Sequence, residues 1–188
     1  MIATHDHHVV LDACVLIPPV LCDILLRCAE TPALYRPRWT VQILDEVSRN
    51  QERAARMTPE SIASWRGVVG TFFPEALIKR YQHFEPECLN HPDDRHVLAA
   101  AIRIEADTIV TFNTRHFPAE SLQPWGVSAR TPDDYLNVLY DHAPLIFTSK
   151  LSQMAEKRSL TLAELTGRLA NHCPTLGSRI RLDQSLDS

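Results

Sequence analysis

The sequence predicts a three-layer α/β/α domain with a mainly parallel sheet, followed by a helical C-terminal extension. Short apolar runs alternate with segments of helical periodicity, and only helical signals remain from residue 131 onward. The 188 residues are 45% hydrophobic and 22% charged, a composition typical of globular domains that bury a core. We therefore expect a domain over residues 1–142 and an extension over residues 143–188.

Composition narrows the classes of function. The net charge of −4 excludes a global basic field, so a nucleic-acid partner would need local basic groups. Gly-rich phosphate-binding loops are absent from the sequence, which has 5 glycines. The apolar runs fall short of the roughly 18 residues that a membrane span needs. With five scattered cysteines and no signal-peptide pattern, the sequence predicts a cytoplasmic protein with reduced thiols.

The first predicted strand is the apolar run Val9 to Leu11, and Asp12 stands at its carboxyl end. Pro18 and Pro19 can begin a helix, because the missing N–H groups of proline cost nothing there. The apolar residues at helical spacing in that helix are Leu21, Ile24, Leu25 and Cys28. This part of the chain is thus expected to form a strand followed by a helix.

Two helices are expected next. Thr40 can cap the first, which carries Glu46 at the edge of its apolar face. That face is expected to hold Val41, Leu44 and Val47. Thr58 can begin the second helix, which ends before Pro74, and a short strand is expected over residues 77–78.

The segment DDRHVLAAAIRIEA is expected to form a helix that begins at Pro92. Its apolar stripe consists of Val97, Leu98, Ala101 and Ile102. Asp94 is three and four residues before the first two of these, which places it on the same face at the positive end of the helix. The strand DTIVTF follows over residues 107–112, with Asn113 just beyond its end, and a last short strand is expected over residues 127–129.

Helix signals dominate the rest of the chain. Thr131 caps a helix that completes the α/β domain, and a second helix is expected over residues 144–158. Thr161 and Glu164 have the spacing of a capping box for a third helix. The extension is therefore expected to be helical.

Three carboxylates and one amide are expected to meet at one edge of the sheet. Asp12 and Asn113 follow strands, and ligands of parallel sheets bind outside the carboxyl ends of strands. Asp94 lies at a helix start near the same edge, and Glu46 can join from its helix. Two carboxylates about 4 Å apart repel by roughly 4 kcal/mol at an effective dielectric of about 20. Shared protons or a divalent cation relieve that repulsion, and oxygen ligands favour Mg²⁺ or Mn²⁺ over Zn²⁺. Such a site suits phosphodiester hydrolysis by an activated water.

Four segments, VVLDACVL, ILDEV, DDRHVLAAAI and DTIVTFNTRHFP, resemble the PIN domain of VapC-like toxins from type II toxin–antitoxin pairs. The resemblance covers residues 8–140, and the tail is similar to that of longer members with a helical extension. It implies cleavage of single-stranded RNA at an acidic Mg²⁺ or Mn²⁺ site, in a homodimer that a small antitoxin protein inhibits. By motif match, the metal-binding acids correspond to Asp12, Glu46 and Asp94. Asn113 stands where many members have a fourth acid, and Thr111 matches the polar residue before it.

The amide of Asn113 leaves less negative charge than a fourth acid would, so binding of one or of two metal ions stays open. Arg95, Arg115 and His116 neighbour the proposed acids. They could hold RNA phosphates by charge-assisted hydrogen bonds, or they could be surface side chains paired with nearby acids.

Two other functions remain open at this point. The chain could be a PIN-fold RNA- or protein-binding module whose catalysis is weakened by Asn113. It could also be a structure-specific DNA nuclease, although no added helical arch precedes residue 113. A phosphatase with Asp12 as nucleophile is disfavoured, because the haloacid-dehalogenase family needs a second acid two residues on, where Cys14 stands.

Overall fold

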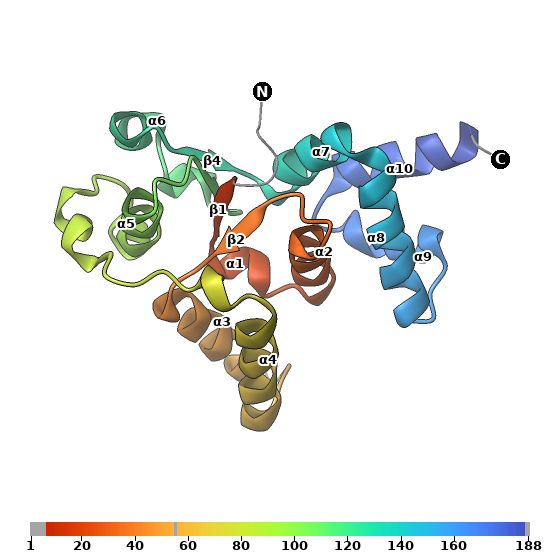
Figure 1. The fold of residues 1–188 in the computed structure, drawn as a ribbon, viewed down its shortest axis with the longest axis horizontal. Helices are drawn as coiled ribbons and strands as arrows, with labels where there is room; N and C mark the ends of the chain where they lie inside the picture. The colour runs from red at the N-terminus through yellow and green to blue at the C-terminus, as the bar shows by residue number, and fades with distance from the viewer. Residues whose placement is uncertain (1–6, 55, 187–188) are drawn as a thin grey trace.

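The computed structural model describes residues 7–54 and 56–186, and it is built around a parallel four-stranded sheet in the order β2-β1-β3-β4 (Figure 1). The strands are β1 (His8–Leu11), β2 (Arg36–Arg38), β3 (Thr108–Val110) and β4 (Ser128–Arg130). The parallel α/β fold expected from the sequence is confirmed.

Helices cover the sheet and extend beyond it (Figure 1). They are α1 (Ala13–Leu16), α2 (Pro19–Ala29), α3 (Val41–Arg53), α4 (Pro59–Phe72), α5 (Arg95–Arg103), α6 (Ala119–Leu122), α7 (Pro132–His142), α8 (Pro144–Lys157), α9 (Leu162–Leu169) and α10 (Pro174–Leu186). Helix α5 packs on β1 and β3, whereas α2 packs on β2 on the other side of the sheet (Figure 1). Parallel strands joined by such helices are buried on both faces, which explains their apolar sequences.

The predicted helix starts are confirmed at four threonines. The side-chain oxygens of Thr40, Thr58, Thr131 and Thr161 each accept a hydrogen bond from the backbone N–H three residues on. Glu164 completes the predicted capping box by accepting from the N–H of Thr161. Such caps satisfy N–H groups that have no partner inside the helix, so they fix where each helix begins.

Several local expectations were wrong. Val41 is 50% exposed, because at about 100° per residue it lies some 160° around the axis of α3 from the buried Ile43. Leu77 forms a single parallel bridge with Trp39 instead of a strand. The helical segment expected from Pro92 does begin at that residue, but its first turn, Pro92–Asp94, is 3-10 and it becomes α-helical at Arg95.

Four elements were not foreseen in the sequence: α1, β2, α6 and α10. Strand β2 has the sequence RPR, and its pairing with β1 rather than an alternating apolar pattern makes it a strand. Helix α10 begins where the carboxylate of Asp133 accepts hydrogen bonds from the N–H groups of Thr175 and Leu176, both at 2.9 Å. These contacts come from distant segments, so local sequence signals were weak.

The C-terminal helices share the core of the domain. Phe147, Leu151 and Met154 of α8 are fully buried, and α8 packs on α2. Nζ of Lys150 donates a 2.9 Å hydrogen bond to the carbonyl oxygen of Glu30 at the end of α2. The boundary between residues 142 and 143 stays a prediction. Across the described ranges, 7–54 and 56–186, no helix has both the length and the apolar character required to cross a membrane.

Candidate functional site

The site begins at the carboxyl edge of the two central strands. Leu11 of β1 is in register with Val110 of β3, so the residues that follow them emerge side by side. These are Asp12 and Thr111, and the N–H of Asp12 donates a 3.1 Å hydrogen bond to the carbonyl of Val110. The predicted place of Asp12 at a strand end is therefore confirmed.

The carboxylate of Asp12 is buried and its two oxygens differ. Oδ2 accepts a 2.6 Å hydrogen bond from Oγ1 of Thr111 and a 3.1 Å hydrogen bond from Sγ of Cys14. Among the described residues, Oδ1 has no side-chain hydrogen bond. Burial raises the pKa of Asp12 and the charge of Asp94 adds to the rise, while these two hydrogen bonds and one from the backbone of Ala13 oppose it. The deprotonated form is thus held in one orientation but lacks solvation.

The carboxylates of Glu46 and Asp94 interact electrostatically with that of Asp12. Glu46 is half-buried on α3, and loss of solvation raises the pKa of its carboxyl group. The charges of Asp12 and Asp94 raise this pKa further, whereas that of His96 lowers it. Nε2 of His96 lies 3.2 Å from Oε1 of Glu46, an ion-pair distance without hydrogen-bond geometry. The fold therefore brings the three predicted acids within electrostatic range of one another.

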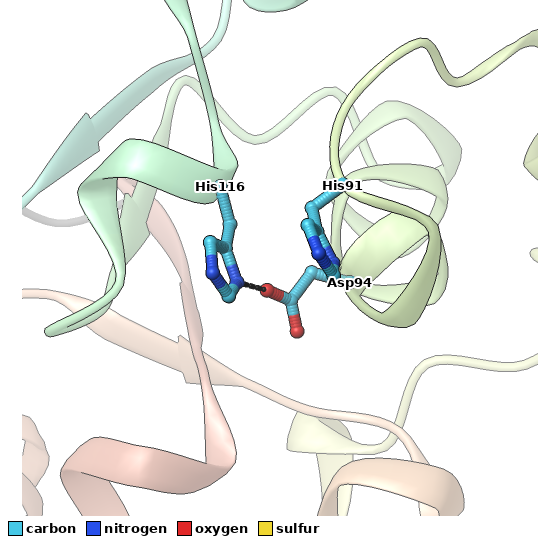
Figure 2. A group of neighbouring side chains, drawn as sticks. All are labelled: His91, Asp94 and His116. Carbon is cyan, nitrogen blue, oxygen red and sulfur yellow. Dashed lines mark hydrogen bonds and ion pairs between the residues drawn. The ribbon is translucent and has the colours of Figure 1, made fainter.

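Asp94 is the first residue before α5, yet its side chain makes no capping hydrogen bond. Instead, Oδ2 of Asp94 lies 2.6 Å from Nδ1 of His116 (Figure 2). The imidazole of His91 stacks on that of His116, with ring centroids 4.2 Å apart and planes 15° apart. Asp94 is thus directed into the site and is not used to cap its helix.

The other predicted residues lie around this edge. Thr111 is buried, and its hydroxyl oxygen accepts a 2.9 Å hydrogen bond from the N–H of Asn113. Asn113 is half-buried just before the 3-10 turn Thr114–His116. Arg115 is exposed, while Arg95 is half-buried, with an Nε that is buried and has no hydrogen-bond partner in the structure.

Three residues of the site were missed as functional candidates: Cys14, His91 and His96. The pKa of the Cys14 thiol is raised to about 12 by burial and by the charge of Asp12, so it stays protonated and donates to that carboxylate. The sequence did offer a signal, because Cys14 and His96 each stand two residues after a predicted acid. His91 offered none, since its contact with His116 depends on the fold.

Two sets of possible metal ligands result. The acids Asp12, Glu46 and Asp94 supply oxygen atoms in a region of reduced solvation, which fits Mg²⁺ or Mn²⁺. A tighter group consists of His91, Asp94 and His116, in which one potential ligand atom from each lies within 4.8 Å of the others (Figure 2). Asp12 and Glu46 do not join this tighter group, so an ion among the three acids would need side-chain rotation or bridging water.

Comparison with known proteins gives a partial match. No protein-family model and no solved structure matches the chain significantly. A stretch of 47 residues is 55% identical to a protein of Mycobacterium tuberculosis (strain ATCC 25618 / H37Rv) described as "Putative ribonuclease VapC50". The stretch spans 25% of this chain and 28% of that relative's length. The chain is therefore similar, over about a quarter of its length, to a protein named as a ribonuclease.

Proposed function

We propose that this chain is a divalent-metal-dependent endoribonuclease and the toxin component of a toxin–antitoxin pair. The observation that carries the proposal is the convergence of Asp12, Glu46 and Asp94 at the carboxyl edge of the sheet, where the charge of Asp94 raises the pKa of Asp12 and the charges of Asp12 and Asp94 raise that of Glu46. The 47-residue similarity to a protein named as a ribonuclease supports the same activity. The PIN-like motifs around these acids support the toxin role.

Four residues would act on the ion and the water. Asp12 and Asp94 would bind the ion directly, and Glu46 with Asn113 would position the ion or its water. When bound, Mg²⁺ or Mn²⁺ supplies an activated water and neutralises charge on phosphoryl oxygens. Thr111 would hold the Asp12 carboxylate in place through its hydrogen bond to Oδ2. Water attack on phosphorus would leave 3′-hydroxyl and 5′-phosphate ends.

Basic groups near the acids would hold the RNA. Arg115 is exposed and can reach a phosphate, and one guanidinium group can bind two oxygens of the same phosphate. Arg95 has an unpartnered buried Nε, and His116 lies against Asp94. We assign these three side chains to phosphate binding.

The proposed partners are an RNA substrate, a small antitoxin protein and a second copy of the chain, in the cytoplasm. An apolar groove of about 470 Å³ between α2, α3 and α4 supports a protein partner. Trp65, Val68 and Phe72 line it, and the last two are more than half exposed. Exposed apolar side chains gathered in one groove are typical of protein interaction sites.

Cleavage of a mixed pool of structured RNAs in Mg²⁺, Mn²⁺ or EDTA tests the activity. Asp12→Ala and Asp94→Ala should abolish cleavage, whereas Glu120→Ala, an exposed acid on α6, should retain it. Cleavage in EDTA, or products with cyclic phosphates, would refute the proposed mechanism. Equal cleavage by the wild type and both variants would refute the site.

A second candidate is a PIN-fold RNA- or protein-binding module with weakened catalysis. It is favoured by Asn113, whose amide stands where the resemblance expects a fourth acid. RNA binding without turnover, measured on the same RNA pool, would establish this function instead.

A further inference from the structure

Three side chains from two separate segments form a compact group beside the acids. His91 precedes the 3-10 turn that ends at Asp94, and His116 ends another 3-10 turn. The N–H of His91 donates a 3.0 Å hydrogen bond to the carbonyl oxygen of His116. This backbone contact fixes the two segments together, so the spacing of the three side chains is set by the fold.

The chemistry of this group differs from that of the acids. It offers two imidazole nitrogens and one carboxylate oxygen, a set that suits Zn²⁺ and other transition metals, whereas Mg²⁺ prefers oxygen ligands. Three protein ligands with an open position are typical of zinc sites that exchange ligands. We propose that His91, Asp94 and His116 form a binding site for a transition-metal ion of the Zn²⁺ class.

The geometry is close to what such an ion needs. Ligand atoms bonded to zinc at about 2.0–2.2 Å are roughly 3.4 Å apart in a tetrahedral site. The three potential ligand atoms already lie within 4.8 Å of one another, and binding of an ion would turn the two stacked rings apart so that all three atoms face it. In Figure 2 the Asp94 carboxylate lies at the edge of the two stacked imidazole rings and contacts Nδ1 of His116.

The burial of the group gives an ion both support and access. The side chains of Asp94 and His116 are 13% and 23% exposed, which limits their freedom to turn away. The side chain of His91 is 43% exposed, so the group opens to solvent on that side. Nδ1 of His91 also accepts a 3.3 Å hydrogen bond from the N–H of Asp93, which orients the ring.

Ion binding here does not depend on RNA cleavage, but one consequence does. Asp94 belongs both to this group and to the acids proposed to bind Mg²⁺. An ion held by the two histidines would therefore compete with Mg²⁺ for Asp94, a consequence that rests on the proposed nuclease function. Zn²⁺ would then inhibit cleavage in Mg²⁺.

Calorimetric titration of the untagged, metal-free full chain with Zn²⁺ tests the site. His5, His7 and His8 near the N-terminus offer other ligands, so the readout is the difference in stoichiometry between variants. The wild type should bind one more Zn²⁺ than the His91→Ala/His116→Gln double variant. His91→Ala alone and His116→Gln alone should each lower the Zn²⁺ affinity of that site at least tenfold. His142→Ala, at an exposed histidine on α7, should leave it unchanged. Equal stoichiometry and affinity in all of these proteins would overturn the proposal.

Two further measurements keep the test clear. His91→Asn keeps a hydrogen-bond acceptor for the N–H of Asp93, and its circular dichroism spectrum should match that of the wild type while the extra Zn²⁺ is lost. In RNA cleavage with Mg²⁺, Zn²⁺ should inhibit the wild type and inhibit His91→Asn at least tenfold less. Absence of all cleavage with one Zn²⁺ still bound would refute the proposed nuclease and retain the metal site. Cleavage without the extra Zn²⁺ would refute the metal site alone.

Discussion

The hydroxyl of Thr111 donates a 2.6 Å hydrogen bond to Oδ2 of Asp12, although 99 positions separate the two residues in the sequence. The contact exists because β1 and β3 are adjacent and in register, so that both residues emerge at the same edge of the sheet. It is a buried bond to a charged group, a class that contributes more than neutral hydrogen bonds do. It links the stability of the sheet edge to the orientation of the proposed metal ligand.

Thr111→Val should test this link. Valine keeps the shape of threonine but cannot donate to Asp12 or accept from the N–H of Asn113. We expect the free energy of unfolding to fall by about 1–3 kcal/mol, measured by urea denaturation. Since that hydrogen bond lowers the pKa of Asp12, its loss should also move the acid limb of the pH–rate profile to higher pH. Thr71→Val, which removes one exposed hydrogen bond in α4, should leave the pH profile unchanged.

Asp12→Asn should abolish cleavage and yet stabilise the metal-free protein. Burial raises the pKa of Asp12, so the folded state binds the proton more tightly than the unfolded state. Ionisation of Asp12 therefore destabilises the folded state. This destabilisation is absent below the pKa of Asp12 in the unfolded state, and it grows as the pH rises toward the pKa in the folded state. We expect a gain on the order of 1 kcal/mol at pH 8 and a smaller gain near pH 4, from urea denaturation at both values. A variant less stable than the wild type at pH 8 would contradict the prediction.

Mg²⁺ should stabilise the wild-type fold. An ion that binds only the folded state adds about 2.7 kcal/mol at a concentration 100 times its dissociation constant. Thermal unfolding followed with increasing Mg²⁺ should show a rising midpoint in the wild type. The rise should be absent in Asp94→Asn and preserved in Glu120→Gln. Equal rises in all three proteins would place the ion elsewhere.

Helix α8 should be required by the domain, because its buried face packs on α2. Leu151→Ala should lower the free energy of unfolding by about 2–5 kcal/mol, whereas Leu145→Ala, at an 86% exposed position, should change it by less than about 0.5 kcal/mol. A chain that ends at residue 142 should show non-cooperative unfolding, because the face of α2 that packs on α8 becomes exposed. Cooperative unfolding of that shorter chain, followed by circular dichroism, would establish residues 1–142 as an independent domain.

Local signals in the sequence were sufficient for the strongest elements. Apolar runs predicted the central strands, and capping threonines predicted four helix starts correctly. Helix α10 was not foreseen, because the carboxylate that caps it, that of Asp133, belongs to α7. The helix and its cap are 41 residues apart in the sequence, and a pattern read along a short window cannot register such a contact.

The candidate site also combines features that the sequence predicted with features that only the fold determines. Strand ends and helix starts pointed to Asp12, Asp94 and Asn113, because in a parallel sheet these positions share one edge. Their roles in metal binding stay predictions. The hydrogen bond from Thr111 to Asp12 and the stacking of His91 on His116 could not be predicted, since they depend on the register of β3 and on the turns that follow it.

The sequence by itself determined the α/β fold class and the candidate acids, because periodicity, capping and strand ends are local properties of the chain. Only the tertiary structure decided which atoms meet. Register between β1 and β3 gave Asp12 a donor from Thr111, and a backbone hydrogen bond between His91 and His116 set two imidazoles beside Asp94. These distances follow from packing among distant segments, which sets burial, pKa and ligand spacing together.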